Sequence, residues 1–245
     1  MSVSDWGLPH FIFISRQVSR ASPIQKESLV KAWMRAITTL PSNLQSHFTV
    51  LEGTLSSLPP DLLRCDCVVS PANAFGIMEG GYDHALSLAF QGVDGPQTLS
   101  RHVQRALRAR WHGYLPPGSC LITTLPESDG NPFGASSIAI LPTMRYPVDV
   151  RWHRDLVYNA VWNLLVEINR WNSELVAHGT ENSYGKTIER VLMTGLGTGH
   201  GQMSAVRCAQ QMILAIKHFS EGVPEDAGWE KVDSWIKEVN ATLEL

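Results

Sequence analysis

The chain has 245 residues, of which 44% are hydrophobic, and its formal net charge is −3. This length is enough to bury a large core, as one large α/β domain or as two small ones. The charge balance includes no basic stripe suited to the phosphate backbone of a nucleic acid, so we expect no nucleic-acid partner. The arginines between residues 101 and 110 are more typical of a solvated helix face.

The cysteines and the N-terminus bear on the class of protein. Cys65, Cys67, Cys120 and Cys208 have neither the spacing of a disulfide framework nor that of a metal site. The first residues contain no basic segment followed by an apolar core, and the apolar run at 11–14 is too short to cross a bilayer. We therefore expect a reduced protein of the cytoplasm or nucleus, with no metal, cofactor or membrane contact.

The N-terminal region predicts a βαβ unit. The apolar run at 10–15 indicates a strand, and Ser22 followed by Pro23 is typical of a helix start. The helix should end at Pro41, and a second strand is expected at 48–51. Because such crossovers join parallel strands, the residues after 51 should lie at the carboxyl end of a strand.

The next strand ends in a loop that we call the first cradle, residues 70–83. Cys67 to Val69 are apolar, and the cradle then begins with Ser-Pro-Ala-Asn and ends with Gly-Gly-Tyr-Asp before apolar residues return at helical spacing. Open α/β sheets bind ligands beyond the carboxyl ends of their strands, where loops and helix N-termini present free amide groups. The pattern indicates a ligand site.

A similar arrangement recurs late in the chain, in what we call the second cradle, residues 194–204. An apolar strand at 188–193 runs into a loop with alternate glycines, and a helix carrying residues 205–219 follows. Because glycine has no Cβ, such a loop allows backbone amides to approach an anion closely. Two cradles of this kind favour a binding site for a phosphate group. The glycines are also consistent with a tight turn alone.

The remaining elements alternate between helix and strand. In chain order, we expect a helix carrying Leu99 to Trp111, strands at 119–124 and 137–141, a long helix with a buried stripe from Val157 to Ile168, a polar surface loop at 174–186, and a last helix from Trp229 to Leu243 that packs on the outside. This alternation predicts a three-layer α/β/α sandwich with a mixed, largely parallel central sheet.

In this order, the motifs resemble those of macro domains. That family's first ligand loop runs Asn-Ala-Ala-Asn, a spacer, three glycines, Val and Asp, and residues 70–83 are similar to it. The second cradle resembles the family's diphosphate loop, and residues 115–118 resemble its middle portion. The resemblance implies one macro-like domain over 1–245, with an N-terminal strand–helix extension at 10–47, a macro core at 48–219 and a C-terminal helix at 224–245.

The resemblance also implies a pocket for ADP-ribose. By position, Asn73 would contact the distal ribose, and Asp83 would activate the water that attacks its anomeric carbon. Thr54 stands where the family has an Asp that reads adenine. The other ligand-binding positions implied are Ser70, Ala72, Gly80, Gly81 and Tyr82 in the first cradle, and Gly195, Gly197, Thr198, Gly199, His200 and Gly201 in the second.

The activity implied is hydrolysis of ADP-ribose 1''-phosphate, O-acyl-ADP-ribose or ADP-ribosylated protein, without a cofactor. Two alternatives stay open: a non-catalytic reader of free or protein-linked ADP-ribose, and a divergent domain for another nucleotide or phosphosugar. Single residues also have structural interpretations. Asp83 is favoured by the helix dipole in a first turn, Asn73 suits a turn, and His200 is typical of a solvated loop.

Overall fold

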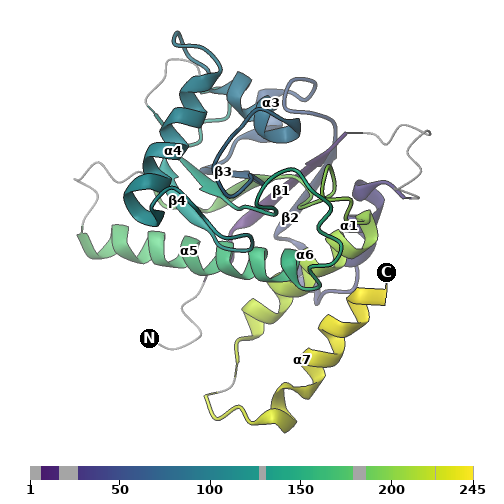
Figure 1. Ribbon diagram of the computed structural model, residues 1–245. Helices are drawn as coiled ribbons and strands as arrows, with labels where there is room; N and C mark the ends of the chain where they lie inside the picture. Colours follow the sequence, from purple (N-terminus) through teal and green to yellow (C-terminus); the bar gives the residue numbers. More distant parts are fainter. Residues whose placement is uncertain (1–6, 17–26, 127–130, 179–185, 224, 245) are drawn as a thin grey trace.

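The computed structural model describes residues 7–16, 27–126, 131–178, 186–223 and 225–244 (Figure 1). Its strands are β1 (His10–Ser15), β2 (Phe48–Glu52), β3 (Cys67–Ser70), β4 (Leu121–Thr124), β5 (Ser137–Ile140) and β6 (Arg190–Met193). Its α-helices are α1 (Leu29–Ile37), α2 (Ser42–Gln45), α3 (Gly81–Ala89), α4 (Gln97–Trp111), α5 (Leu156–His178), α6 (Ala205–Glu221) and α7 (Trp229–Ala241), with short 3-10 turns η2 (Pro60–Leu63) and η3 (Thr242–Glu244).

The described strands form one sheet in the order β2-β1-β6-β3-β5-β4. The pairs from β2 to β5 are parallel, and only the edge strand β4 runs antiparallel to its neighbour β5. The predicted mixed, largely parallel sheet is confirmed. Because β3 and β6 are neighbours, the two cradles follow strands that end at the same edge of the sheet.

Helices cover both faces of this sheet, and the division follows the period of two along each strand. On β3, Cys67 and Val69 face the core under α1, α5 and α6, whereas Val68 faces the core under α3 and α4. The helices contribute matching apolar stripes, such as Leu99, Val103 and Leu107 of α4, which are fully buried. The three-layer α/β/α prediction is therefore confirmed.

The N-terminal unit is part of the sheet and not an appendage. β1 pairs with β2 on one side and with β6 on the other, so it is an interior strand. Its parallel pairing with β2 confirms the predicted βαβ unit. The helix start predicted at Ser22 lies outside the described residues, and the described helix α1 begins at Leu29 with the Ser28 side chain accepting from Lys31 N.

The predicted end of the long helix changes. The segment 174–186 was expected to be a loop, but α5 continues to His178, so its first five residues are helical. Leu175 explains this continuation, since its side chain is only 6% exposed and extends the buried stripe of the helix. Residues 179–185 and the connector at 127–130 lie outside the described residues. No helix of the described chain is long and apolar enough to span a membrane.

The last helix packs on the outside, as predicted, and an aromatic stack holds it there. The ring of Trp235 on α7 lies parallel to that of His218 on α6, with centroids 4.4 Å apart and an interplanar angle of 2°. Trp162 of α5 meets the same tryptophan edge-on at 5.8 Å. Glu238 accepts a 2.7 Å hydrogen bond from Lys217 Nζ beside the stack. Trp235 and Glu238 therefore join α7 to α5 and α6.

We predict that Trp235→Ala lowers the free energy of unfolding by about 2–3 kcal/mol, because it removes the ring that joins α7 to α5 and α6. Urea denaturation measures this change. Trp229→Ala is the matched control on the same helix: Trp229 is 82% exposed, and we expect a change within about 0.5 kcal/mol. Equal effects of the two substitutions would contradict the role of the stack.

Candidate functional site

The candidate site lies at the carboxyl edge of β3 and β6. β3 pairs with β6 through Cys67 and Val191 and through Val68 and Leu192, so the two strands run in parallel and in register. The first cradle leaves β3 and leads into α3, and the second leaves β6 and leads into α6. The sheet therefore brings together two loops that are more than a hundred residues apart in the sequence.

A buried carboxyl group joins the two ends of the first cradle. Asp83 lies in the first turn of α3, and its Oδ1 accepts a 2.7 Å hydrogen bond from the hydroxyl of Ser70, the last residue of β3. Ser70 is fully buried and Asp83 keeps 9% of its surface exposed. Burial raises the pKa of Asp83 to about 7, against the opposing effect of the Ser70 hydrogen bond.

This pKa has a chemical consequence. A carboxyl group with a pKa near neutral pH exchanges a proton readily under physiological conditions, which suits general acid or base catalysis. Strongly perturbed groups of this kind also cluster at functional sites. The structure thus separates Asp83 from an ordinary helix-capping carboxylate, which would be ionised at neutral pH.

The side chain of Asn73 holds the first cradle together. Its Nδ2 donates to the carbonyl of Ile77 at 2.7 Å, and its Oδ1 accepts from the amides of Phe75 and Ile77 at 3.1 and 3.3 Å. Met78 N then donates to Ser100 Oγ on α4 at 3.2 Å. The structural interpretation of Asn73 is therefore supported, and its contact with a ribose stays a prediction.

The residues at the end of the first cradle divide into open and packed positions. At Gly80 and Gly81 an added Cβ would meet nothing within 4 Å, so both backbones border open space. No side chain caps the N-terminus of α3 at Gly80. Ala72, in contrast, is 1% exposed and belongs to the core.

Tyr82 turns toward the core and not toward the open side. Its ring packs against the cluster under α3 and α4, and its hydroxyl is buried without a hydrogen-bond partner among the described residues. Burial, followed by the nearby Cys65 and Asp83, raises the pKa of this phenol well above its usual value. A ligand contact of Tyr82 stays a prediction that requires the ring to leave this position.

Two glycines of the second cradle are needed for packing. A Cβ on Gly195 would lie 2.2 Å from Leu29 Cδ2 on α1, and one on Gly201 would lie 2.4 Å from the carbonyl oxygen of Gly197. Within the loop, Met203 N donates to Gly197 O at 3.0 Å, and Val150 N donates to Gly201 O at the same distance. These glycines let the loop fold back on itself.

The middle of the second cradle is the part that faces solvent. Gly199 and His200 are exposed, and a Cβ on Gly199 would meet nothing within 4 Å. Gly197 has a φ of +68°, which favours glycine, and Thr198 Oγ1 donates to Gly195 O at 3.5 Å. The loop is thus closed at its ends and open around residues 199 and 200.

Thr54 lies after β2, which is separated from β6 by β1. Its Oγ1 accepts from Ser57 N at 3.1 Å and donates to Ser57 Oγ at 3.0 Å, so the hydroxyl closes a local turn. Its predicted contact with adenine has no direct support from this arrangement and stays a prediction.

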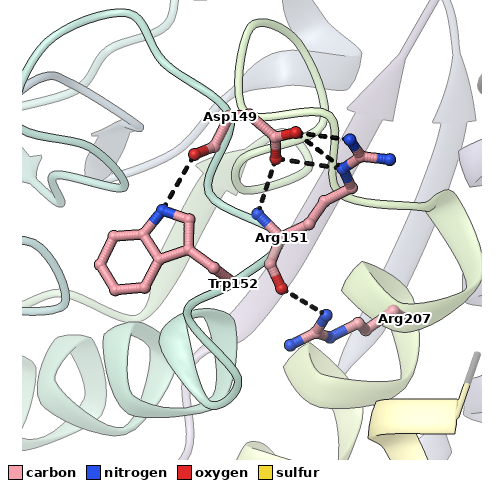
Figure 2. A network of polar contacts seen from close by, with 4 residues as sticks. All are labelled: Asp149, Arg151, Trp152 and Arg207. Carbon is pink, nitrogen blue, oxygen red and sulfur yellow. Dashed lines mark hydrogen bonds and ion pairs between the residues drawn. The ribbon is translucent and has the colours of Figure 1, made fainter.

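A third loop, residues 142–155, completes the site and was missed by the sequence analysis. It leaves β5 and packs against Gly201 through Val150. Figure 2 shows Asp149 paired with Arg151, and Trp152 Nε1 donating to the carbonyl of Asp149 at 3.0 Å. The Trp152 side chain itself is 75% exposed.

Arg207 of α6 donates hydrogen bonds to main-chain carbonyls of this third loop (Figure 2). Its guanidinium donates to the carbonyls of Arg151 at 3.1 Å, His153 at 3.3 Å and Arg154 at 2.6 Å, and the residue is 8% exposed. Arg207 is the one arginine of α6, and a buried arginine has to find several acceptors.

The chemistry available is that of carboxyl, hydroxyl and backbone amide groups. No group of three or more His, Cys, Asp or Glu residues in the described part of the chain has the geometry to hold a metal ion. All four cysteines are free and buried, and burial raises their thiol pKa values, so they are poor nucleophiles. Asp83 is the buried carboxyl group of the candidate site.

The raised pKa of Asp83 predicts how stability depends on pH. The folded protein holds this proton more tightly than the unfolded chain, so Asp83 costs no stability below its ordinary pKa of 3.8 and an increasing amount as the pH rises to about 7. Asp83→Asn removes this cost. Relative to the wild type, we expect the variant to gain on the order of 2–4 kcal/mol between acid and mildly alkaline pH.

Urea denaturation of both proteins over a pH series measures this gain. Asp61→Asn is a control carboxyl substitution, because Asp61 is exposed at the surface in the turn η2. We expect no such rise for this control. Parallel stability curves for Asp83→Asn and the wild type would contradict the raised pKa.

Comparisons with known proteins give only structural similarities. No protein-family model matches the chain, and no curated protein matches it. A mutant macrodomain of Oceanobacillus iheyensis with ADPR has 16% sequence identity and a TM-score of 0.45, over 76% of this chain and 91% of that one. The macrodomain of the same organism with ADP has 17% identity and a TM-score of 0.46, over 76% and 88%. The macrodomain of Mycobacterium tuberculosis DarG has 16% identity and a TM-score of 0.41, over 80% and 90%.

Proposed function

We propose that this protein binds ADP-ribose or a derivative between its two cradles and hydrolyses a bond at the distal ribose. The observation that carries the proposal is the buried pair of Ser70 and Asp83 at the end of β3, beside a second glycine-rich loop on the neighbouring strand. The ligand class is what the resemblance of the two motifs to those of macro domains implies. The buried carboxyl group supports the hydrolytic part of the proposal.

The binding part of the proposal rests on backbone amides. The N-terminus of α3 begins at Gly80 and Gly81 without a side-chain cap, and a helix N-terminus attracts phosphate through its free amides and its dipole. Gly199 presents a second open stretch of backbone on the adjacent strand's loop. A diphosphate between these two stretches would be bound without a metal or a basic side chain, which agrees with the acidic net charge of the chain.

The catalytic part rests on Asp83. As a carboxylate it accepts a proton from a water molecule, the water oxygen forms a bond to the anomeric carbon of the distal ribose, and the bond from that carbon to the leaving oxygen breaks. The electron pair leaves with the departing phosphate or carboxylate group. A positioned general base of this kind contributes about 10²–10⁴-fold in rate. The Ser70 hydroxyl fixes one carboxyl oxygen, which leaves the other for the water.

Binding is tested first. We predict that the wild type binds ADP-ribose with micromolar affinity, about −8 kcal/mol, in a calorimetric titration, and that Gly199→Val weakens this binding about tenfold or more. The valine has room at its Cβ, so it should fold, but its methyl groups occupy the open side of the second cradle.

Gly228→Val is the matched control, because Gly228 also has nothing within 4 Å of an added Cβ and lies at the start of α7. We expect it to bind as the wild type does. AMP and ribose phosphate serve as ligand controls. No heat with ADP-ribose, together with binding of a different nucleotide or phosphosugar, would replace the proposed ligand class; the local hydrogen bonds of Thr54 are the observation that favours this outcome.

Catalysis has a pH signature. We predict that the hydrolysis rate of an ADP-ribosylated protein, ADP-ribose 1''-phosphate or O-acyl-ADP-ribose rises with pH and levels off above about 7, because Asp83 acts only as the carboxylate. Ser70→Ala should move this rise to higher pH, since the Ser70 hydrogen bond lowers the pKa of Asp83. Asp83→Asn should lose about 10²-fold or more in rate while still binding ADP-ribose.

A rate that falls above pH 7 would instead make Asp83 a general acid. The second candidate function is a non-catalytic reader, which the hydrogen bonds of Asn73 favour, since its amide is already used by the loop. For a reader, ADP-ribose binds and no product forms from any of the substrates at any pH.

A further inference from the structure

The outer face of α4 is rich in basic side chains. The helix has four arginines and no acidic residue along its fifteen positions. Beside it runs an open groove of about 630 Å³, lined by Asp94, Thr98, Arg101, Gln104, Arg105 and Arg108. The sequence alone favoured a solvated helix face here, and the groove is the feature that the structure adds.

In the described part of the chain, no carboxylate forms an ion pair with Arg101, Arg105 or Arg108, although Asp94 lines the same groove. Arg101 and Arg105 are four residues apart, and like charges at this spacing destabilise a helix. The helix dipole compensates Arg108 in the last turn but neither of the other two. Within the described residues, no carboxylate in an ion pair relieves this repulsion.

This groove borders the first cradle directly. Gln104, which lines the groove, donates from Nε2 to the carbonyl of Phe75 at 3.4 Å, and the cradle residue Gly76 packs on Val103 and Leu107 of the same helix. Arg101 and Arg108 lie three and four positions from Gln104, on the same side of α4. A molecule in the candidate site and one in the groove would therefore be neighbours.

Exposed apolar side chains flank the same border. Phe75 and Ile77 of the cradle are 42% and 43% exposed, and Trp111 and Tyr114 at the end of α4 are 38% and 37% exposed. Phe75 and Tyr114 meet edge-on with centroids 5.5 Å apart. Arginine, tryptophan and tyrosine are the residues that contribute most at protein–protein interfaces.

We propose that the α4 groove binds an extended acidic segment of the protein that carries the ADP-ribose, and this rests on the function proposed above. Arg101 and Arg105 are about 6 Å apart along the helix axis. In an extended peptide, side chains on one face repeat about every 6.6 Å. Carboxylates at alternate positions would therefore lie opposite successive arginines, while the modified side chain enters the cradle.

A protein segment fits this surface better than a nucleic acid does. The chain has a net charge of −3, so the basic field is confined to one helix and cannot follow a long phosphate backbone. The groove also includes Asp94, whose carboxylate can accept hydrogen bonds from peptide amides, a donor that a phosphate backbone lacks.

We test the groove with two fluorescent peptides, one alternating Glu and Ser and one alternating Gln and Ser, by anisotropy on the full chain. We expect the Glu peptide to bind, the Gln peptide to bind at least about tenfold more weakly, and added salt to remove the difference. Arg105→Glu with Arg108→Glu should lower affinity for the Glu peptide about tenfold or more, and so should the milder pair Arg105→Gln with Arg108→Gln.

The matched control is Arg170→Glu with Lys237→Glu, which changes the net charge equally on α5 and α7 and should leave peptide binding unchanged. Free ADP-ribose is titrated separately: its affinity should be the same in the wild type and in both groove variants, so a failure of ADP-ribose binding is distinguished from a failure of the groove. Equal binding of the two peptides, or tighter binding of a single-stranded oligothymidylate than of the Glu peptide, would overturn the proposal.

Discussion

The parallel pairing of β3 with β6 is the constraint on which the site depends. It aligns two strands whose sequences are far apart, and Asp66 fixes this alignment at the amino ends of the strands. The Asp66 carboxylate accepts from the amides of Glu189 and Arg190 at 3.0 and 2.8 Å, and its carbonyl accepts from Ser136 and Ser137 on the way into β5. Because β3, β5 and β6 are parallel and each is four residues long, their ends lie within about one residue of one another, and the loops that follow them meet. Asp66, at the opposite end of these strands, thus contributes to the register that brings the cradles together.

The same edge holds a second constraint, which is electrostatic. Burying a carboxyl group is unfavourable unless it is protonated or well paired, and Asp83 has one hydroxyl partner and no basic one in the described structure. A cation at this position would stabilise the carboxylate, but it would also lower its pKa and its ability to accept a proton. A buried carboxyl group without a basic partner lowers the stability of the fold, and proteins are known to lose stability in this way where activity requires such a group. The Ser70 hydrogen bond is an intermediate solution, since it orients the carboxyl without neutralising it.

The sequence predicts the features that depend on local patterns. It does not predict the features that depend on contacts between residues far apart in the chain. Alternation and helical spacing were sufficient for the strands, for the faces of α4 and α5, and for the two cradles, because each is a property of a short segment. The interior position of β1 was not predictable in this way, since it depends on β1 pairing with β6. The structural role of Asn73, the turn closed by Thr54 and the third loop held by Arg207 likewise depend on partners that periodicity does not reveal.

The glycines of the second cradle show why a motif alone overstates a ligand site. All four alternate glycines have the same sequence signal, yet Gly195 and Gly201 are required by Leu29 and by the carbonyl of Gly197, and only Gly199 borders open space. The close packing at Gly195 and Gly201 nevertheless affects Gly199. A loop that is held at both ends presents the amide groups around Gly199 in one conformation. A preorganised loop loses less entropy when it binds an anion than a mobile one does. Gly195 and Gly201 therefore serve packing, whereas the proposed anion binding depends on Gly199, so substitutions at the two kinds of position separate the stability of the loop from its proposed affinity for a ligand.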